Sequence, residues 1–322
     1  MVRMYGCLNL FLRGIDMISK WTSAALVALF AVAAAAAQSA PARPKITGIS
    51  HLAVYTSDAA ATEHYYVASV GAVKLADPEN PKGVRYAFSA TQWVEVLPPG
   101  AGVNRLDHTA WTTESAEGMR KYLAAKGWKT PASVKKSADG SRWFSVLDPE
   151  GNTVEFVQPS GKPVEAPNAL GHHIIHMGIL VHSQEAENKF YREILGFRPY
   201  WFGGMHPDKL DWVSQQAPDG HDWLEYMLAG GPGAGIPADM TQSRLGVLDH
   251  LSVGEVSVPD AWQKLVDAHR LEGKHDAAPK IGLDGKYQFN MYDPDGIRLE
   301  MMNFHATNKP CCSPFTADDP NE

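Results

Sequence analysis

The sequence predicts an α+β fold built from four repeats of one unit, in which a strand is followed by a helix and then by about three more strands. Three observations indicate the repeat. A short apolar strand that carries a histidine occurs four times, a helical stretch follows each of these strands, and the motif Asp-Pro-x-Gly-x-x-x-Glu occurs twice. Self-similarity at a spacing of tens of residues is typical of a chain assembled from one repeated structural unit.

The first strand of each unit is short and mostly apolar. The four read ISHLAVYTS, LDHTAWTTE, IIHMGILVH and LDHLSVGEV, around His51, His108, His176 and His250. The helical stretches that follow span 58–71, 115–127, 183–196 and 258–273. Three of the four close on a glycine directly after the last periodic residue, where a helix commonly ends in a left-handed residue.

The repeated turn motif reads DPEGNTVEF at 148–156 and DPDGIRLEM at 293–301. Proline fixes φ at the second position of a turn, and the glycine accepts the positive φ that lets the chain reverse into another strand. Side chains alternate along that strand, so Ile297 and Leu299 share one face while Arg298 and Glu300 share the other. Glu155 is placed in the same way in the first copy.

The repeats pair into two domains, because units of this size are too small to hold a core alone. A segment rich in Pro and Gly, 159–171, is the expected linker between a first domain over 47–158 and a second over 172–304. Residues 305–322 are expected to form a disordered tail. Its adjacent Cys311 and Cys312 are not expected to pair with each other.

Residues 1–40 are expected to be a leader with a secretory signal peptide. One lysine precedes an apolar run, and small residues then offer an Ala-x-Ala cleavage site near Ala37. Met1 and Met17 both remain candidate starts. The pattern predicts a secreted or periplasmic protein with no integral membrane span after processing.

The net charge of −7 and the lack of Lys or Arg runs argue against a nucleic-acid partner. A small-molecule substrate is the expected partner. Nothing in the sequence chooses between a monomer and a homodimer.

The histidine strands, FYREILGF at 190–197 and the two turn motifs together resemble the vicinal oxygen chelate superfamily. Its members include glyoxalases, extradiol dioxygenases, bleomycin-resistance proteins and epimerases. The resemblance covers nearly all of residues 47–304. It implies four βαβββ modules that pair into two half-barrel domains.

The resemblance also implies two ligand sets for a divalent metal. Position by position, the second domain offers His176, His250 and Glu300, and the first offers His51, His108 and Glu155. Two imidazoles and a carboxylate suit Fe, Mn, Zn or Ni.

Glu225 and Glu95 fall where glyoxalase-like lyases contribute an additional carboxylate ligand, which favours lyase or isomerase chemistry. Extradiol dioxygenases usually have a tyrosine three residues before the Asp-Pro, where this chain has Asn290 and Ser145. The second domain is the preferred active one, with Glu225, Tyr226 and Tyr292 as expected catalytic residues. An Fe(II) extradiol-type dioxygenase and a metal-free binding or resistance protein remain the alternatives.

Overall fold

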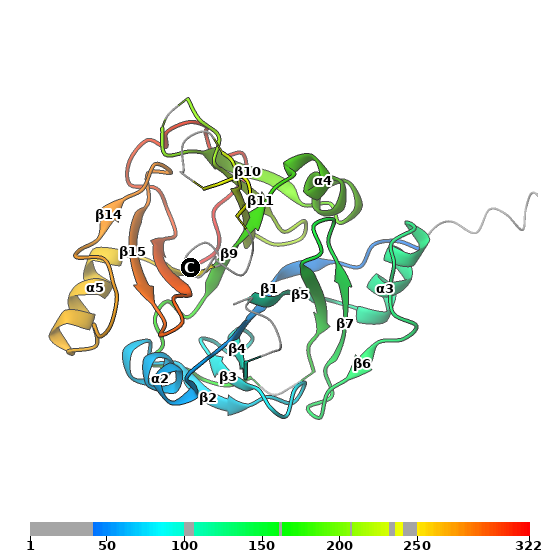
Figure 1. Cartoon of the computed structure of the whole chain (residues 1–322), viewed down its shortest axis with the longest axis horizontal. Coiled ribbons are helices and arrows are strands. Elements are labelled where there is room, and N and C mark those ends of the chain that lie inside the picture. The colour runs from blue at the N-terminus through cyan, green and yellow to red at the C-terminus, as the bar shows by residue number, and fades with distance from the viewer. Residues whose placement is uncertain (1–40, 100–105, 161–162, 207, 232–235, 241–249) are drawn as a thin grey trace, which may run out of the picture. The chain divides into compact units, whose positions relative to one another are not determined.

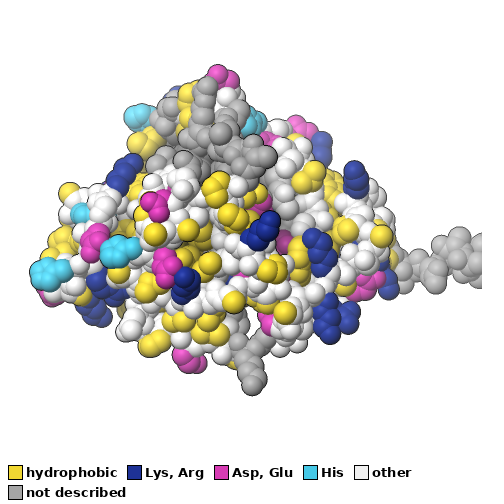
Figure 2. Space-filling model, turned by 60° about the horizontal axis from the view of Figure 1, so that its bottom comes forward, with side chains coloured by type: hydrophobic (Ala, Val, Ile, Leu, Met, Phe, Trp, Pro, Cys, Tyr) yellow, Lys and Arg dark blue, Asp and Glu magenta, His cyan; other side chains and the backbone are white. Residues whose placement is uncertain are grey.

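The computed structural model describes residues 41–99, 106–160, 163–206, 208–231, 236–240 and 250–322. The predicted leader, 1–40, lies outside these ranges. Residues 43–322 form one compact unit. Among the described helices, none is both long enough and apolar enough to cross a membrane. On the face drawn in Figure 2, acidic and basic side chains are interspersed.

Two eight-stranded sheets contain the four repeats. The first has the strand order β2-β3-β4-β1-β5-β8-β7-β6, and the second repeats that order as β10-β11-β12-β9-β13-β16-β15-β14 (Figure 1). Each sheet joins two βαβββ modules through an antiparallel pair of first strands, β1 with β5 and β9 with β13. The predicted fold of four modules paired into two half-barrels is therefore confirmed.

The strands of the first sheet are β1 (Ile46–Tyr55), β2 (Val73–Ala76), β3 (Val84–Ala87), β4 (Trp93–Leu97), β5 (Leu106–Thr113), β6 (Lys135–Lys136), β7 (Arg142–Leu147) and β8 (Thr153–Gln158). Those of the second are β9 (Ile174–Val181), β10 (Arg198–Gly203), β11 (Trp212–Gln216), β12 (Trp223–Leu228), β13 (His250–Glu255), β14 (Lys280–Ile281), β15 (Tyr287–Tyr292) and β16 (Arg298–Asn303).

One helix follows the first strand of every module. They are α2 (Ala59–His64) with a π-helical turn η1 (Tyr65–Ser69), α3 (Ala116–Ala125), α4 (Gln184–Asn188) with η2 (Lys189–Ile194), and α5 (Val258–Asp267). An Asp or Ser side chain accepts a backbone hydrogen bond at each N-terminus. The glycines that follow the helices, Gly71, Gly127, Gly196 and Gly273, all have positive φ. The ends expected for the first three helical stretches are thus found, whereas α5, expected to reach Gly273, ends at Asp267 and is followed by the left-handed residue His269.

The two half-barrels share a hydrophobic core instead of having one each. A single buried cluster contains residues from both sheets. The Trp128 and Phe190 rings stack at 4.6 Å, which holds the helix of the third module against the first domain. The Gln92 side chain also donates to the Ile174 backbone oxygen at 2.9 Å. This sharing explains why residues 43–322 form one unit.

The segment 305–322, expected to be disordered, packs on the second half-barrel. The Asp319 carboxylate accepts a hydrogen bond from Lys286 Nζ at 2.8 Å and another from the Tyr200 hydroxyl. The Phe202 backbone N–H donates to Ser313 Oγ at 2.9 Å. Cys311 and Cys312, which were not expected to pair, are joined as a disulfide. Polar anchors therefore make this segment part of the second domain.

Candidate metal centres

The second half-barrel brings together the three ligands predicted for it. His176 on β9, His250 on β13 and Glu300 on β16 occupy neighbouring strands, and all three side chains are buried. The Nε2 atoms of His176 and His250 are 3.0 Å apart, and Glu300 Oε2 is 3.2 Å from His176 Nε2. Their donor atoms all lie within 4.8 Å of one another. This set is called the second centre below.

Glu225 reaches the second centre from β12. Its Oε2 is 3.5 Å from His250 Nε2, so the fourth carboxylate expected from the sequence faces the same cluster. Burial raises the pKa of Glu225. Burial alone would also raise that of Glu300, but the Arg298 charge and the hydrogen bond with His176 outweigh it and lower the pKa of Glu300 to about 2. The two carboxylates of this centre therefore hold protons with very different strength.

Gly178 makes the second centre possible, which the sequence did not reveal. It is opposite His250 in the β9–β13 register, and a Cβ atom there would be 1.9 Å from His250 Cε1. The imidazole thus occupies the space of a missing side chain. The only sequence signal was a glycine two residues after His176, on the same face of the strand.

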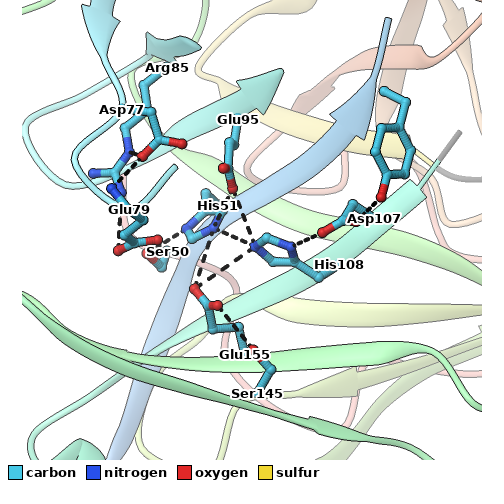
Figure 3. Close-up of polar contacts among 11 residues, drawn as sticks. Ser50, His51, Asp77, Glu79, Arg85, Glu95, Asp107, His108, Ser145 and Glu155 are labelled. Carbon is cyan, nitrogen blue, oxygen red and sulfur yellow. Dashed lines mark hydrogen bonds and ion pairs between the residues drawn. The ribbon is translucent and has the colours of Figure 1, made fainter. Parts of the chain in front are cut away.

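The first half-barrel repeats the arrangement with the other predicted ligands (Figure 3). The Nε2 atoms of His51 and His108 are 2.8 Å apart. Glu95 Oε2 is 3.6 and 3.5 Å from these two nitrogens, and Glu155 Oε1 is 3.8 and 3.9 Å from them. We call this set the first centre.

Outer contacts orient the ligands of the first centre. Asp107 Oδ2 is 2.7 Å from His108 Nδ1, and Ser50 Oγ is 3.1 Å from His51 Nδ1. Such partners fix the tautomer and the direction of a metal-binding imidazole. In the second centre, by contrast, His176 Nδ1 is buried without a hydrogen-bond partner. Asp107 and Ser50 each stand directly before the histidine that they contact, and this adjacency was the signal in the sequence that could have identified them.

An acidic network that the sequence did not reveal surrounds the first centre. Arg85 Nε is 3.1 Å from Asp77 Oδ1, and Arg85 Nη2 is 3.0 Å from Glu79 Oε1 (Figure 3). Burial and the nearby Asp77 raise the pKa of Glu95. Burial likewise raises the pKa of Glu155 to about 7. The first centre and its surroundings thus contain four buried carboxyl groups, those of Asp77, Glu79, Glu95 and Glu155, beside the single guanidinium of Arg85.

Both centres fit a divalent metal. Each places two imidazole nitrogens and at least one carboxylate oxygen around one point, which is the donor chemistry of Fe(II), Mn(II), Zn(II) and Ni(II) sites. Two nitrogens each about 2.1 Å from a metal and at right angles to one another are about 3.0 Å apart, close to the separations found. Glu155 Oε1 is also buried without a hydrogen-bond partner.

The cavities beside the two centres differ in their walls. Each has a volume of about 400 Å³. The cavity of the second centre is lined by aromatic and Met side chains, including Tyr200, Trp201, Trp212, Trp223, Phe315 and Met302. That of the first centre is lined mainly by polar groups, with Leu97 and Trp143 as its large apolar side chains. An organic substrate would find apolar contact mainly in the second.

The two tyrosines expected to be catalytic lie apart from the second cavity. Tyr226 follows Glu225 on β12, so it points to the opposite face, where it is buried in the core 6.0 Å from the Tyr191 ring. Tyr292 pairs with Arg298 across β15 and β16. It lines a separate cavity with His64 and Tyr65. The structure brings neither hydroxyl to the second centre.

Comparisons with known proteins agree with this architecture. The model of the Glyoxalase/Bleomycin resistance protein/Dioxygenase superfamily matches residues 173–301. No curated protein sequence matches the chain.

Three solved structures have similar folds at low sequence identity. The Mn(II)-bound glyoxalase from Novosphingobium aromaticivorans is 17% identical, with a TM-score of 0.61 over 81% of this chain and 83% of its own. A catechol 2,3-dioxygenase is 17% identical, with a TM-score of 0.60 over 86% and 96%. A mutant homoprotocatechuate 2,3-dioxygenase from Brevibacterium fuscum is 17% identical, with a TM-score of 0.61 over 87% and 75%. At this identity the likeness establishes the fold alone.

Proposed function

Residues 173–301 belong to the glyoxalase/bleomycin resistance/dioxygenase superfamily, and on that basis we propose that the chain is a metal-dependent enzyme whose catalytic centre is the second centre. The proposed chemistry is that of a lyase or isomerase acting on a small organic substrate with vicinal oxygens. The observation that carries this proposal is the cluster of His176, His250 and Glu300, of which Glu300 lines an aromatic cavity together with Glu225. A divalent metal bound there would act as a Lewis acid toward substrate oxygen.

Glu225 is the proposed general base. It lies 3.5 Å from His250 Nε2 and lines the cavity, so its carboxylate can face both the ligand cluster and a bound substrate. Its raised pKa suits a group that takes a proton from the carbon beside a polarised carbonyl and returns it to a neighbouring atom. The aromatic walls would exclude water while the proton moves.

An Fe(II) extradiol-type dioxygenase is the second candidate. The flat aromatic side chains around the cavity favour it, because they can stack on a planar ring. Against it, Asn290 stands opposite Glu300 where a dioxygenase usually has tyrosine, and its amide donates to Asp276 at 2.8 Å.

The first centre is proposed to bind a second metal ion without an organic substrate. Its four ligand candidates, His51, His108, Glu155 and Glu95, are buried, and polar outer contacts hold them in place. A buried excess of carboxylate favours a divalent cation. Its mainly polar cavity offers an organic molecule little apolar surface.

Metal analysis of the purified protein followed by oxygen uptake with a panel of catechols tests the proposal. We expect manganese, nickel or zinc and no oxygen consumption. Stoichiometric iron together with catechol-dependent oxygen uptake would establish the dioxygenase instead. Protein without transition metal, and with the same ligand affinity after His250→Ala, would favour a metal-free binding protein.

A further inference from the structure

The second cavity contains an arginine, Arg298, that forms no hydrogen bond and no ion pair with the described residues. Arg298 is two residues before Glu300 on β16, so both side chains point to the cleft face, and Arg298 lines the cavity. Its Nε is buried and has no hydrogen-bond partner. A buried donor that stays unpaired is destabilising, so such a group in a cavity points to a ligand that would accept its hydrogen bond.

The other cations of this cavity are already paired. Lys286 Nζ lies 2.8 Å from Asp319 Oδ1 and also donates to the Phe304 backbone oxygen at 2.7 Å. Lys280 Nζ is 3.5 Å from Asp276 Oδ2. Of the three cationic side chains in the cavity wall, Arg298 is the one that forms no ion pair with a described residue, although its charge acts on Glu300 and Glu225.

Glu300, the nearest acidic residue along β16, does not form an ion pair with Arg298. The Arg298 charge helps to keep Glu300 ionised, yet no oxygen of Glu300 lies within the 4.0 Å of an ion pair. Glu300 instead points to His176, at 3.2 Å. A metal bound at the second centre would further engage the charge of Glu300, which leaves Arg298 available.

The arginine is specific to the second half-barrel. In the β13–β16 register His250 pairs with Arg298, whereas in the equivalent β5–β8 register His108 pairs with Thr153. The buried arginine beside the first centre, Arg85, comes from a different strand, β3, and forms ion pairs with Asp77 and Glu79. Within the described part of the chain, the second centre is therefore the one that combines a metal-ligand cluster with a guanidinium that forms no ion pair.

We propose that Arg298 binds a carboxylate of the substrate while the vicinal oxygens of the same molecule face the second centre. The proposal rests on the proposed function, and it narrows the substrate class to organic acids. A guanidinium presents two parallel N–H groups that match a carboxylate. Residues i and i+2 of a strand are about 7 Å apart, so the carboxylate would lie a short distance from the metal ligands, across the body of a small substrate.

Two probe molecules that share vicinal hydroxyls and an aromatic ring test the proposal. 3,4-Dihydroxybenzoate carries a carboxylate and 4-methylcatechol does not. Titration calorimetry of the zinc-loaded protein under anaerobic conditions should show the carboxylate probe binding roughly 10- to 100-fold more tightly. Arg298→Gln should remove this preference while 4-methylcatechol binds as before, and Arg298→Lys should retain part of it.

Lys280→Gln is the matched control, because it also removes one positive charge from the wall of the same cavity. It should leave the preference intact. Equal binding of the two probes to the unchanged protein would overturn the proposed role of Arg298, and so would a preference that survives Arg298→Gln. Neither result would contradict the proposed function. If neither probe binds the zinc-loaded protein more tightly than the metal-free protein, the proposed chelating function fails, and with it this inference.

Discussion

The two half-barrels hold nearly the same His–His–Glu cluster in opposite surroundings. The Nε2 atoms of the paired histidines are 2.8 Å apart in the first centre and 3.0 Å apart in the second. Polar outer contacts and surplus carboxylates surround the first, whereas aromatic walls and an unpaired arginine surround the second. The strand register thus repeats the His–His–Glu cluster in both half-barrels, and we propose that the cavity walls determine which of the two centres binds a substrate.

The largest expected effect is that of Gly178→Ala on the second centre. The added methyl group would overlap the His250 ring, so the imidazole must turn away from His176. We expect a loss of metal affinity of more than about 100-fold at the second centre, because displacing a ligand should cost more than the roughly 10- to 100-fold typical of losing an outer partner. Metal analysis should show one ion fewer per chain.

Ala53→Gly is the matched control, since Ala53 stands opposite His108 as Gly178 stands opposite His250. It should leave the metal content unchanged. Full metal content in Gly178→Ala would contradict the requirement for a glycine at this position.

Asp107→Asn should weaken the first centre and spare the second. The Asp107 carboxylate is 2.7 Å from His108 Nδ1 and helps to raise the pKa of that imidazole, although burial opposes it. Loss of such an outer partner typically reduces metal affinity about 10- to 100-fold. Competition with a chelator would measure this, and equal weakening of both centres would argue against an independent first centre.

Metal binding at the first centre should depend more steeply on pH. The pKa of Glu155 is raised to about 7, so below that pH a proton must leave before the carboxylate can bind metal. The pKa of Glu300 is lowered to about 2, so this carboxylate is ionised at every practical pH. From pH 7.5 to 5.5 the first centre should lose up to about tenfold more affinity per pH unit. Chelator titrations at both pH values on His250→Ala and His108→Ala, each of which keeps one centre intact, would measure this difference. An equal change of metal affinity with pH in the two variants would contradict the prediction.

Asp319→Asn should have the smallest effect, on the wall of the second cavity. It weakens the contact with Lys286 Nζ, a fully buried ammonium. We expect a loss of about 1–3 kcal/mol in the free energy of unfolding. Denaturant unfolding measures it, with Asp318→Asn as the neighbouring control. An unchanged midpoint would indicate that the C-terminal segment does not stabilise this wall.

The repeat pattern was sufficient to predict the fold and the ligand clusters. Histidine spacing and the Asp-Pro-x-Gly turns are local features, and strand alternation then directs Glu155 and Glu300 into the clefts. The register of the repeats also brought Glu95 and Glu225 to their clusters.

What the sequence did not predict depends on contacts between distant segments. Tyr226 fails as a site residue because it neighbours Glu225 on a strand and so faces the core. The order of the C-terminal segment depends on Lys286 and Tyr200, more than 30 residues away. The network of Arg85 with Asp77 and Glu79 depends on how a loop folds back beside β3.

Metal content and turnover of His108→Ala and His250→Ala, compared side by side, test the central claim most directly. Each variant should bind one metal ion fewer per chain than the unchanged protein. His108→Ala should keep its turnover, and His250→Ala should lose it. Loss of turnover in His108→Ala with retention in His250→Ala would place catalysis in the first half-barrel and contradict the account.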